Sequence, residues 1–212
     1  MLSRLPAEER RVQLVQAALA RAEQDGIGSV TIRRVAEDAG VSLGVVHYCF
    51  ENKEELMSAA IETIVTDLSG ALRNAFAQAG DAARGDRGAE ALREMLRAGI
   101  RGMWQLIENT ANVQLLTYEI TTYALRGGSE ESRGLATRQY EFNTAEATTF
   151  LRDCAARTGT RWIRPVEHVA RLSLSVIDGI VLRWLVDRDS EAALAQFDDV
   201  LELVVGLAAP AE

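Results

Sequence analysis

The segment from Thr31 to Leu56, which reads TIRRVAEDAGVSLGVVHYCFENKEEL, constrains the fold more than any other part of this chain. Thr31 stands where its hydroxyl can accept a backbone N–H and cap a short helix. Gly40 supplies a left-handed turn after that helix, and Ser42 and Asn52 are placed to cap two more helices. Two short helices joined by a glycine turn and followed by a third capped helix form the layout of a helix-turn-helix motif.

The remainder of the chain is also expected to be helical. Of its 212 residues 48% are hydrophobic and 25% charged, which is ordinary for a globular protein. Apolar residues recur at helical spacing along most of the sequence. We expect an all-α fold of about nine helices, with a three-helix N-terminal domain at residues 1–52 and a larger helical domain at residues 53–212.

Caps, glycines and periodicity give the expected boundaries of these helices. They are residues 6–25, 31–39, 42–49, 53–79, 89–107, 113–125, 130–158, 165–186 and 191–207. Residues 80–88 are expected to form a loop, 127–129 to end a helix, and 158–164 to form a connector. Ser190 is expected to cap the last helix.

The net charge of −8 argues against contact with nucleic acid, because phosphate binding favours basic surfaces. The charge is unevenly distributed, however. Residues 1–53 hold seven basic and seven acidic side chains, so all the excess negative charge lies in residues 54–212. The pattern indicates an acidic body that carries a locally neutral N-terminal domain.

Several classes of protein are disfavoured. Cys49 and Cys154 lie far apart, which suits a reducing cytoplasm, and Cys49 is interpreted as a small core residue rather than a redox switch. We expect no signal peptide and no membrane span, since no long uncharged apolar run occurs. Only His47 and His168 are histidines, and no P-loop, HExxH or GxSxG motif occurs. We therefore expect no catalytic residues, no metal site and no cofactor.

The N-terminal region resembles the TetR family of transcriptional regulators over roughly residues 8–60. The resemblance rests on Thr31–Ala36, Ala39–Ser42, Phe50 and Asn52–Leu56. It implies a homodimer that binds a palindromic operator in double-stranded DNA and that an unknown small-molecule effector releases. It also implies a repressor, although an activator or a corepressed regulator remains open.

Matching positions in the family imply a set of DNA-binding residues: Thr31, Arg33, Ser42, Leu43, Gly44, Val45, His47, Tyr48 and Lys53. Leu43 and Val45 can contact a thymine methyl group but cannot form hydrogen bonds with bases. We therefore expect few direct base contacts and more recognition of DNA shape. Arg33 is expected to contact a guanine edge or a phosphate.

Three of these assignments have alternatives. Lys53, the sole lysine of the chain, starts a helix where an anion is favoured, so it is expected to hold a phosphate, but it could be a solvated surface residue. Tyr48 could donate to a phosphate or pack in the small core. For His47, neither a role at the DNA nor its absence is favoured.

The body is expected to provide the dimer interface and the effector pocket. The segment from Leu174 to Asp187 resembles the dimer-forming helix of the family. The residues expected in the interface are Ile177, Ile180, Val181, Trp184, Phe197, Leu201 and Val204. The alternative is that they form the core of a monomer. The residues expected in the pocket are Met103, Trp104, Tyr118, Glu119, Tyr123, Phe142 and Asn143. The alternative is that the aromatic ones are simply core residues, and Glu119 could anchor a cation or merely face water.

The alternatives to a transcriptional regulator are an enzyme and a protein-interaction module. An enzyme is disfavoured by the missing motifs. A helical protein-interaction module without DNA binding remains possible, because the N-terminal domain carries no net charge and Leu43 and Val45 are apolar.

Overall fold

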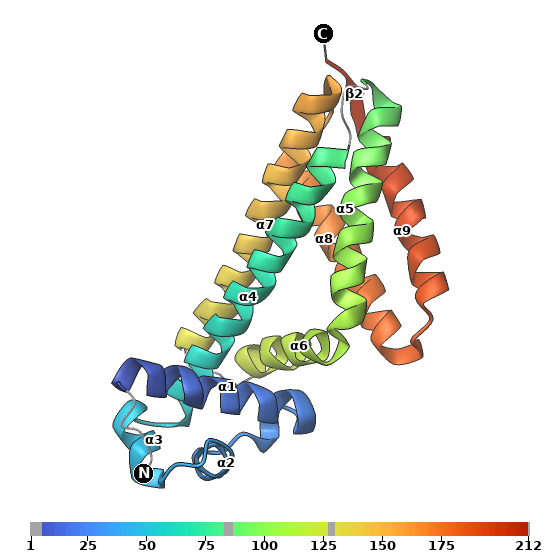
Figure 1. Ribbon diagram of the computed structural model, residues 1–212. Coiled ribbons are helices and arrows are strands. Elements are labelled where there is room, and N and C mark those ends of the chain that lie inside the picture. Colours follow the sequence, from blue (N-terminus) through green and yellow to red (C-terminus); the bar gives the residue numbers. More distant parts are fainter. Residues whose placement is uncertain (1–5, 83–86, 127–129, 212) are drawn as a thin grey trace. The chain divides into compact units, whose positions relative to one another are not determined.

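A computed structural model describes residues 6–82, 87–126 and 130–211, and these ranges are almost entirely helical (Figure 1). The helices are α1 (Ala7–Asp25), the 3-10 turn η1 (Ile27–Ser29), α2 (Ile32–Asp38), α3 (Leu43–Cys49), α4 (Lys53–Ala82), α5 (Ala89–Asn109), α6 (Ala111–Arg126), α7 (Glu130–Thr158), α8 (Val166–Asp187) and α9 (Ser190–Val205). The expected all-α fold is confirmed, with nine α-helices in the described ranges.

Most helix boundaries fall within a few residues of those expected from the sequence, and α7 matches at both ends. Helix α4 extends to Ala82, beyond its expected end near residue 79. Residues 83–86 of the expected loop, and residues 127–129 where a helix was expected to end, lie outside the described ranges. None of the described helices combines the length and apolar character needed to cross a membrane.

The expected connector at residues 158–164 contains a short strand that was not predicted from the sequence. Strand β1 (Thr160–Trp162) pairs antiparallel with β2 (Ala208–Pro210), and Arg161 lies opposite Ala209. Three residues are too few to show the alternation that identifies a strand in a sequence. The pairing joins segments about 50 positions apart in the chain, so it depends on packing.

The chain divides into two compact units. The first comprises the residues up to Asp67 together with Asn112–Gln139, and the second comprises Leu68–Ala111 together with the residues from Tyr140 onward. The boundary expected after residue 52 separates a DNA-binding domain from the rest of the chain, whereas these two units are defined by packing.

In the first unit α1, α2 and α3 pack on one another around a small core. Val30, Val35, Val46 and Phe50 are buried there together with Leu14 of α1. The second unit has its own core, where α5, α7, α8 and α9 meet. Its members are Leu92, Met95, Leu96, Ala147, Leu151, Cys154, Val169, Ala170, Leu201, Val204 and Val205.

Candidate nucleic-acid interface and body cavity

The turn between α2 and α3 has the local geometry expected from the sequence. Thr31 Oγ1 accepts a hydrogen bond from the backbone N–H of Arg34 at 3.2 Å, which confirms the predicted cap of α2. Gly40 has a φ of +65°, a left-handed conformation that side chains other than glycine rarely adopt. Asn52 Oδ1 accepts from the N–H of Glu55 at 2.9 Å and caps α4. The conformation of the segment from Thr31 to Leu56 is therefore stabilised by interactions between residues a few positions apart.

One expected cap is not formed. Ser42 stands at the N-cap position of α3, but its side chain forms no capping hydrogen bond. Its hydroxyl is exposed instead. The cost is small, because an N-terminus at the surface can give its N–H groups to water.

Contacts from α1 fix the position of α3 and the start of α4. The Arg11 guanidinium lies 4.2 Å from the centre of the Phe50 ring and donates to the Cys49 carbonyl and to Glu55 Oε1. Gln13 Nε2 donates to the Ala39 carbonyl at 3.0 Å. Neither role is visible in the sequence, because the partners lie 26 or more positions away.

Arg21 ties α1 to α2 in the same unit. Its guanidinium binds both carboxylate oxygens of Asp38 and donates to Asp25 Oδ2 at 2.8 Å. The Arg21 guanidinium holds the pKa of the Asp38 carboxyl below its ordinary value. This fork geometry favours one placement of α2 on α1.

The outer face of α3 carries most of the side chains predicted to meet DNA. Tyr48 is 80% exposed and Leu43 is 46% exposed, and Gly44 and His47 are exposed as well. Tyr48 therefore does not pack in the small core, which removes that alternative. Val45 is half-buried, at the edge of the face. Cys49 and Val46 are buried on the opposite side.

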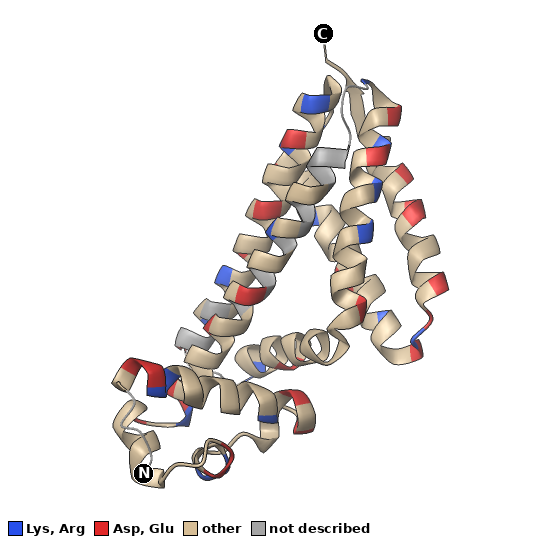
Figure 2. Ribbon diagram, viewed as in Figure 1, with Lys and Arg blue, Asp and Glu red and all other residues tan. Residues whose placement is uncertain are grey.

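Basic and acidic side chains are mixed along α1 and α2, whereas α3 carries neither, so the described residues of this region form no continuous basic stripe (Figure 2). The Arg33 side chain is 84% exposed and pairs with Glu37 in the next turn at 3.1 Å. Arg34 Nη1 donates to the Ser29 carbonyl at 3.3 Å. Lys53 is half-buried and is the first residue of α4. The cations near α3 are few and individually placed.

The residues predicted for the effector pocket are divided between the two compact units. Tyr118, Glu119 and Tyr123 lie on α6 in the first compact unit. Met103 and Trp104 on α5, and Phe142 and Asn143 on α7, belong to the second unit.

Glu119, predicted as a possible cation anchor, has a partner within its own unit. Its Oε2 accepts from the backbone N–H of Ile27 at 2.8 Å. Its carboxylate also lies 3.3 Å from the position that a Cβ on Gly26 would take. Gly26 has a φ of +79° and follows the end of α1. Glu119 thus joins α6 to the turn that leads into α2.

A cavity of about 70 Å³ lies in the second unit, among α5, α7, α8 and α9. It is lined by Leu96, Ile100, Met103, Ala147, Phe150, Leu151, Ser173, Leu174, Ile177, Phe197, Val200, Leu201 and Val204. Met103 alone among the predicted pocket residues lines it. The other lining residues were missed, since in a sequence a cavity wall and a packed core show the same apolar spacing.

Trp104 packs beside this cavity within an aromatic cluster. Its ring lies edge-on to that of Trp184, with centroids 5.1 Å apart, and 5.6 Å from that of Phe197. The indole N–H of Trp184 donates to Ser190 Oγ at 3.1 Å. Ser190 was predicted to cap α9, and this prediction is wrong, because Ser190 is the first residue of the helix. Asp189 Oδ1 caps the helix instead by accepting a hydrogen bond from Ala192 N–H at 2.9 Å.

Most residues predicted for the dimer interface are buried within the single chain. Only Ile177 is half-buried; the buried ones are Ile180, Val181, Trp184, Phe197, Leu201 and Val204. These buried side chains pack within the interior of this chain. The exposed large apolar residues of α8 and α9 are Leu172, Val176, Leu182, Val186, Leu194 and Leu203.

Comparisons with known proteins point to a single class. The family model for bacterial regulatory proteins of the tetR family matches residues 14–60. The nicotine-responsive HTH-type transcriptional repressor HdnoR of Paenarthrobacter nicotinovorans is 28% identical over 185 residues, covering 87% of this chain and 88% of that protein.

Solved structures share the fold along nearly the whole chain. A protein from Rhodococcus sp. assigned to the TetR family superposes with a TM-score of 0.71 at 22% identity, covering 93% of this chain and 99% of its own. The transcriptional regulator FadR from Bacillus subtilis, solved in complex with stearoyl-CoA, gives a TM-score of 0.64 at 17% identity and covers 92% and 97%. The similarity therefore extends well beyond the helix-turn-helix segment.

Proposed function

This chain belongs to the TetR family of transcriptional regulators, and from that premise we propose that it is a homodimeric repressor that binds a palindromic operator and releases it when a small molecule binds the body. The observation that carries the proposal is the outer face of α3. Leu43, His47 and Tyr48 are exposed there, on a helix whose opposite side is locked into the core by Val46 and Cys49. A side chain as large as Tyr48 at 80% exposure suits a surface that binds another molecule.

Phosphate contacts would position this face on the DNA. Lys53 begins α4, where backbone N–H groups and the helix dipole favour an anion. Glu55 in the same turn is already engaged, since its carboxylate accepts from the N–H of Glu51 and pairs with Arg11. The Glu51 N–H and the Arg11 guanidinium hold the pKa of Glu55 below its ordinary value. The lysine would therefore meet the phosphate while this acid stays bound to the protein.

Base recognition on this face would rest on few hydrogen bonds. Leu43 and Val45 can contact thymine methyl groups, and Gly44 allows the backbone to approach the groove closely. His47 and Tyr48 offer the polar groups of α3 that are exposed. Arg33 is freed for DNA once it leaves its surface pair with Glu37, which costs little because exposed pairs contribute about 0–1 kcal/mol. We therefore propose that the shape of the DNA supplies a large part of the specificity.

Dimerisation would use the outward sides of α8 and α9. These two helices pack on each other, yet both leave large apolar side chains in water, among them Leu182, Val186 and Leu203. A second copy of the same face would cover them, which is the self-complementary contact of a two-fold dimer. Such a dimer would set two α3 helices about 34 Å apart, one turn of DNA.

The response to an effector would follow from linkage. A molecule that binds the body shifts the equilibrium only as far as its affinity differs between the DNA-binding and the released states. HdnoR, which covers most of the chain, is named a repressor. This name supports repression rather than activation here.

A single experiment tests the core of the proposal. The purified chain is incubated with random double-stranded DNA, and bound molecules are recovered and sequenced. We expect a palindromic sequence whose affinity falls steeply with salt, because phosphate binding releases counterions. Recovery of no sequence above background at low salt would contradict DNA binding and favour a protein-interaction module.

A further inference from the structure

We propose that the cavity among α5, α7, α8 and α9 binds an uncharged hydrophobic molecule and rejects cationic or anionic ones of the same shape. The inference rests on the proposed function, because it assigns a chemical class to the effector. The described residues that line the cavity all belong to the second compact unit. The geometry of the cavity is therefore set by the packing within that unit.

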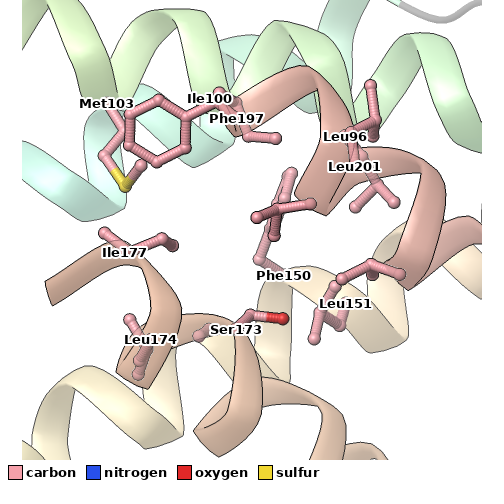
Figure 3. Close-up of a pocket in the computed structure, with 13 residues that line it drawn as sticks. Leu96, Ile100, Met103, Phe150, Leu151, Ser173, Leu174, Ile177, Phe197 and Leu201 are labelled. Atoms are coloured by element: carbon pink, nitrogen blue, oxygen red, sulfur yellow. The ribbon is translucent and has the colours of Figure 1, made fainter. Parts of the chain in front are cut away.

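The described wall residues are apolar except for one serine. Leu96, Ile100 and Met103 come from α5, whereas Phe197 and Leu201 come from α9 (Figure 3). Figure 3 shows Leu174 and Ile177 of α8 on the opposite wall, and Phe150 and Leu151 of α7 also border the space. Among the described residues that line the cavity, none is charged.

Ser173 provides the one polar side chain among the lining residues that the structure describes. Its hydroxyl already donates to the carbonyl of Val169 at 2.8 Å, one turn earlier in α8. The hydroxyl hydrogen is therefore in use, and only the lone pairs of Ser173 Oγ remain to accept a hydrogen bond. A bound carboxylate would find no free side-chain donor there, and a bound ammonium would find no acid. Burying an unpaired ion is far more costly than burying an apolar group of the same size.

The volume of the cavity limits the size of the molecule. About 70 Å³ is less than half of the roughly 150 Å³ of an engineered apolar cavity that holds benzene. A ring must therefore displace part of the wall. Phe150, Leu174 and Ile177 are half-buried, so their side chains have room to move outward.

The Phe150 side chain cannot move toward α5 to enlarge the cavity. A Cβ placed on Gly99 would stand 2.6 Å from Phe150 Cζ, which means that the ring is pressed against the backbone of α5. Any enlargement of the cavity must then come from Phe150 moving away from α5, or from α8 and α9. Leu174 and Ile177 line the cavity on α8, the helix that also carries the exposed Val176. Filling the cavity would thus act on a helix of the proposed dimer face.

The proposed ligand class differs from that suggested by one relative. HdnoR is named nicotine-responsive, and nicotine is an amine that carries a positive charge in neutral water. The described wall of the cavity includes no acid to pair with such a cation. Glu119, the acid singled out in the sequence, belongs to the other compact unit and accepts from Ile27 N–H.

Thermal unfolding of the full-length chain with toluene, benzylamine and benzoate tests the proposal without DNA. The three probes share a ring and differ in charge. Toluene at ten times its Kd should raise Tm by about 3 to 6 °C, and the two charged probes should leave Tm unchanged. An equal rise with benzylamine or benzoate would overturn the proposal, as would no rise with toluene up to saturation.

Two matched variants locate the binding. Ala147→Leu adds three carbon atoms to a buried lining position, and Ala145→Leu adds the same atoms to an exposed position of α7. The toluene shift should vanish in the first variant and persist in the second. If Ala147→Leu does not fold, Ile100→Phe fills the cavity from α5 at a half-buried lining position. A toluene shift that survives in the folded filled variant would place binding elsewhere and contradict the proposal.

Operator binding separates this inference from the proposed function. Toluene that stabilises the chain and also weakens its binding to the selected DNA supports both. Toluene that stabilises the chain but leaves DNA affinity unchanged supports the ligand class and contradicts its role as effector. Failure of the chain to select any DNA contradicts the proposed function and leaves the thermal test of the cavity intact.

Discussion

At the scale of the residue, Lys53 is the proposed phosphate contact of a domain that has no net charge. It is the chain's one lysine, and it stands at the start of α4, where phosphate would be favoured. Lys53→Ala should weaken binding to every DNA sequence by a similar factor. It should also reduce the slope of log affinity against log salt by about one.

The affinity is measured by fluorescence anisotropy at several salt concentrations. Arg101→Ala, at an exposed position of α5, is a control that removes a cation from the second unit and should leave the slope unchanged. A Lys53→Ala variant with the parent affinity and slope would assign Lys53 to the solvated surface.

Two buried threonines of α7 should respond in opposite ways to the same substitution. Thr148 Oγ1 is buried and has no hydrogen-bond partner within the described ranges. Thr158 Oγ1 donates to the Cys154 carbonyl at 2.8 Å and lies 2.9 Å from Thr160 Oγ1. Thr148→Val should raise the free energy of unfolding by about 1 kcal/mol, because it removes an unsatisfied polar group.

Thr158→Val should lower that free energy by about 1 to 2 kcal/mol, because it breaks a buried hydrogen bond and leaves Thr160 with one partner fewer. Urea denaturation monitored by circular dichroism measures both changes. Equal destabilisation by the two substitutions would mean that Thr148 forms a hydrogen bond in solution.

At the scale of the element, the N-termini of α3 and α4 differ in how they are capped. Asn52 Oδ1 accepts from Glu55 N–H, whereas Ser42 forms no capping bond. Asn52→Ala should cost about 1 kcal/mol of stability. Ser42→Ala should change stability by less than about 0.5 kcal/mol, as surface substitutions usually do. Chemical denaturation without DNA compares the two, and a larger loss for Ser42→Ala would reverse the assignment.

Helix α8 carries an acid whose environment makes the stability depend on pH. Burial raises the pKa of Asp178 to about 6, from an ordinary value of 3.8. The folded chain therefore holds this proton to a higher pH than the unfolded chain does. The contribution of Asp178 to the free energy of unfolding should fall as the pH rises from about 4 to about 6.

Asp178→Asn should remove that fall, so the difference in stability between the variant and the parent should grow over this range. Urea midpoints measured at intervals between pH 4 and pH 7 test this. Asp187→Asn is the opposite control, because the Arg183 guanidinium holds the pKa of Asp187 below its ordinary value. A constant difference between Asp178→Asn and the parent would show that Asp178 titrates normally.

At the scale of the whole molecule, the proposed dimer contact through the outward sides of α8 and α9 can be tested with one charged substitution. Val176→Glu places a charge on the apolar face of α8, where Val176 is 37% exposed. A dimer that buries this face should dissociate, since the buried charge would have no partner. Sedimentation should give twice 23.2 kDa for the parent chain and 23.2 kDa for the variant. Leu125→Glu, at an exposed position of α6, should leave the dimer intact. A parent chain that is monomeric at micromolar concentration would contradict the dimer.

Most features that depend on neighbouring residues were predictable from the sequence, although the expected cap by Ser42 is not formed. Thr31, Gly40 and Asn52 act as expected, because a cap or a left-handed turn involves groups only a few positions apart. The predicted bounds of α7 were correct for the same reason, because residues adjacent to its ends determine where the helix starts and stops. At the far end of α8 the same reasoning selected Ser190 although the adjacent Asp189 forms the cap. Two neighbouring residues can both cap a helix, and the choice depends on what else each side chain contacts.

The sequence by itself determined the helices, the helix-turn-helix layout and the apolar character of α8 and α9. Only the tertiary structure decided which side of α8 and α9 is buried, that Glu119 binds Ile27 N–H, and that a cavity opens beside Met103. The physical reason is the range of the interactions. Backbone hydrogen bonds and caps join residues within about one turn of a helix, so the local sequence encodes them. Burial, long-range hydrogen bonds and cavities depend on how helices distant in the sequence pack together, and an apolar pattern fits a core, an interface and a cavity wall equally well.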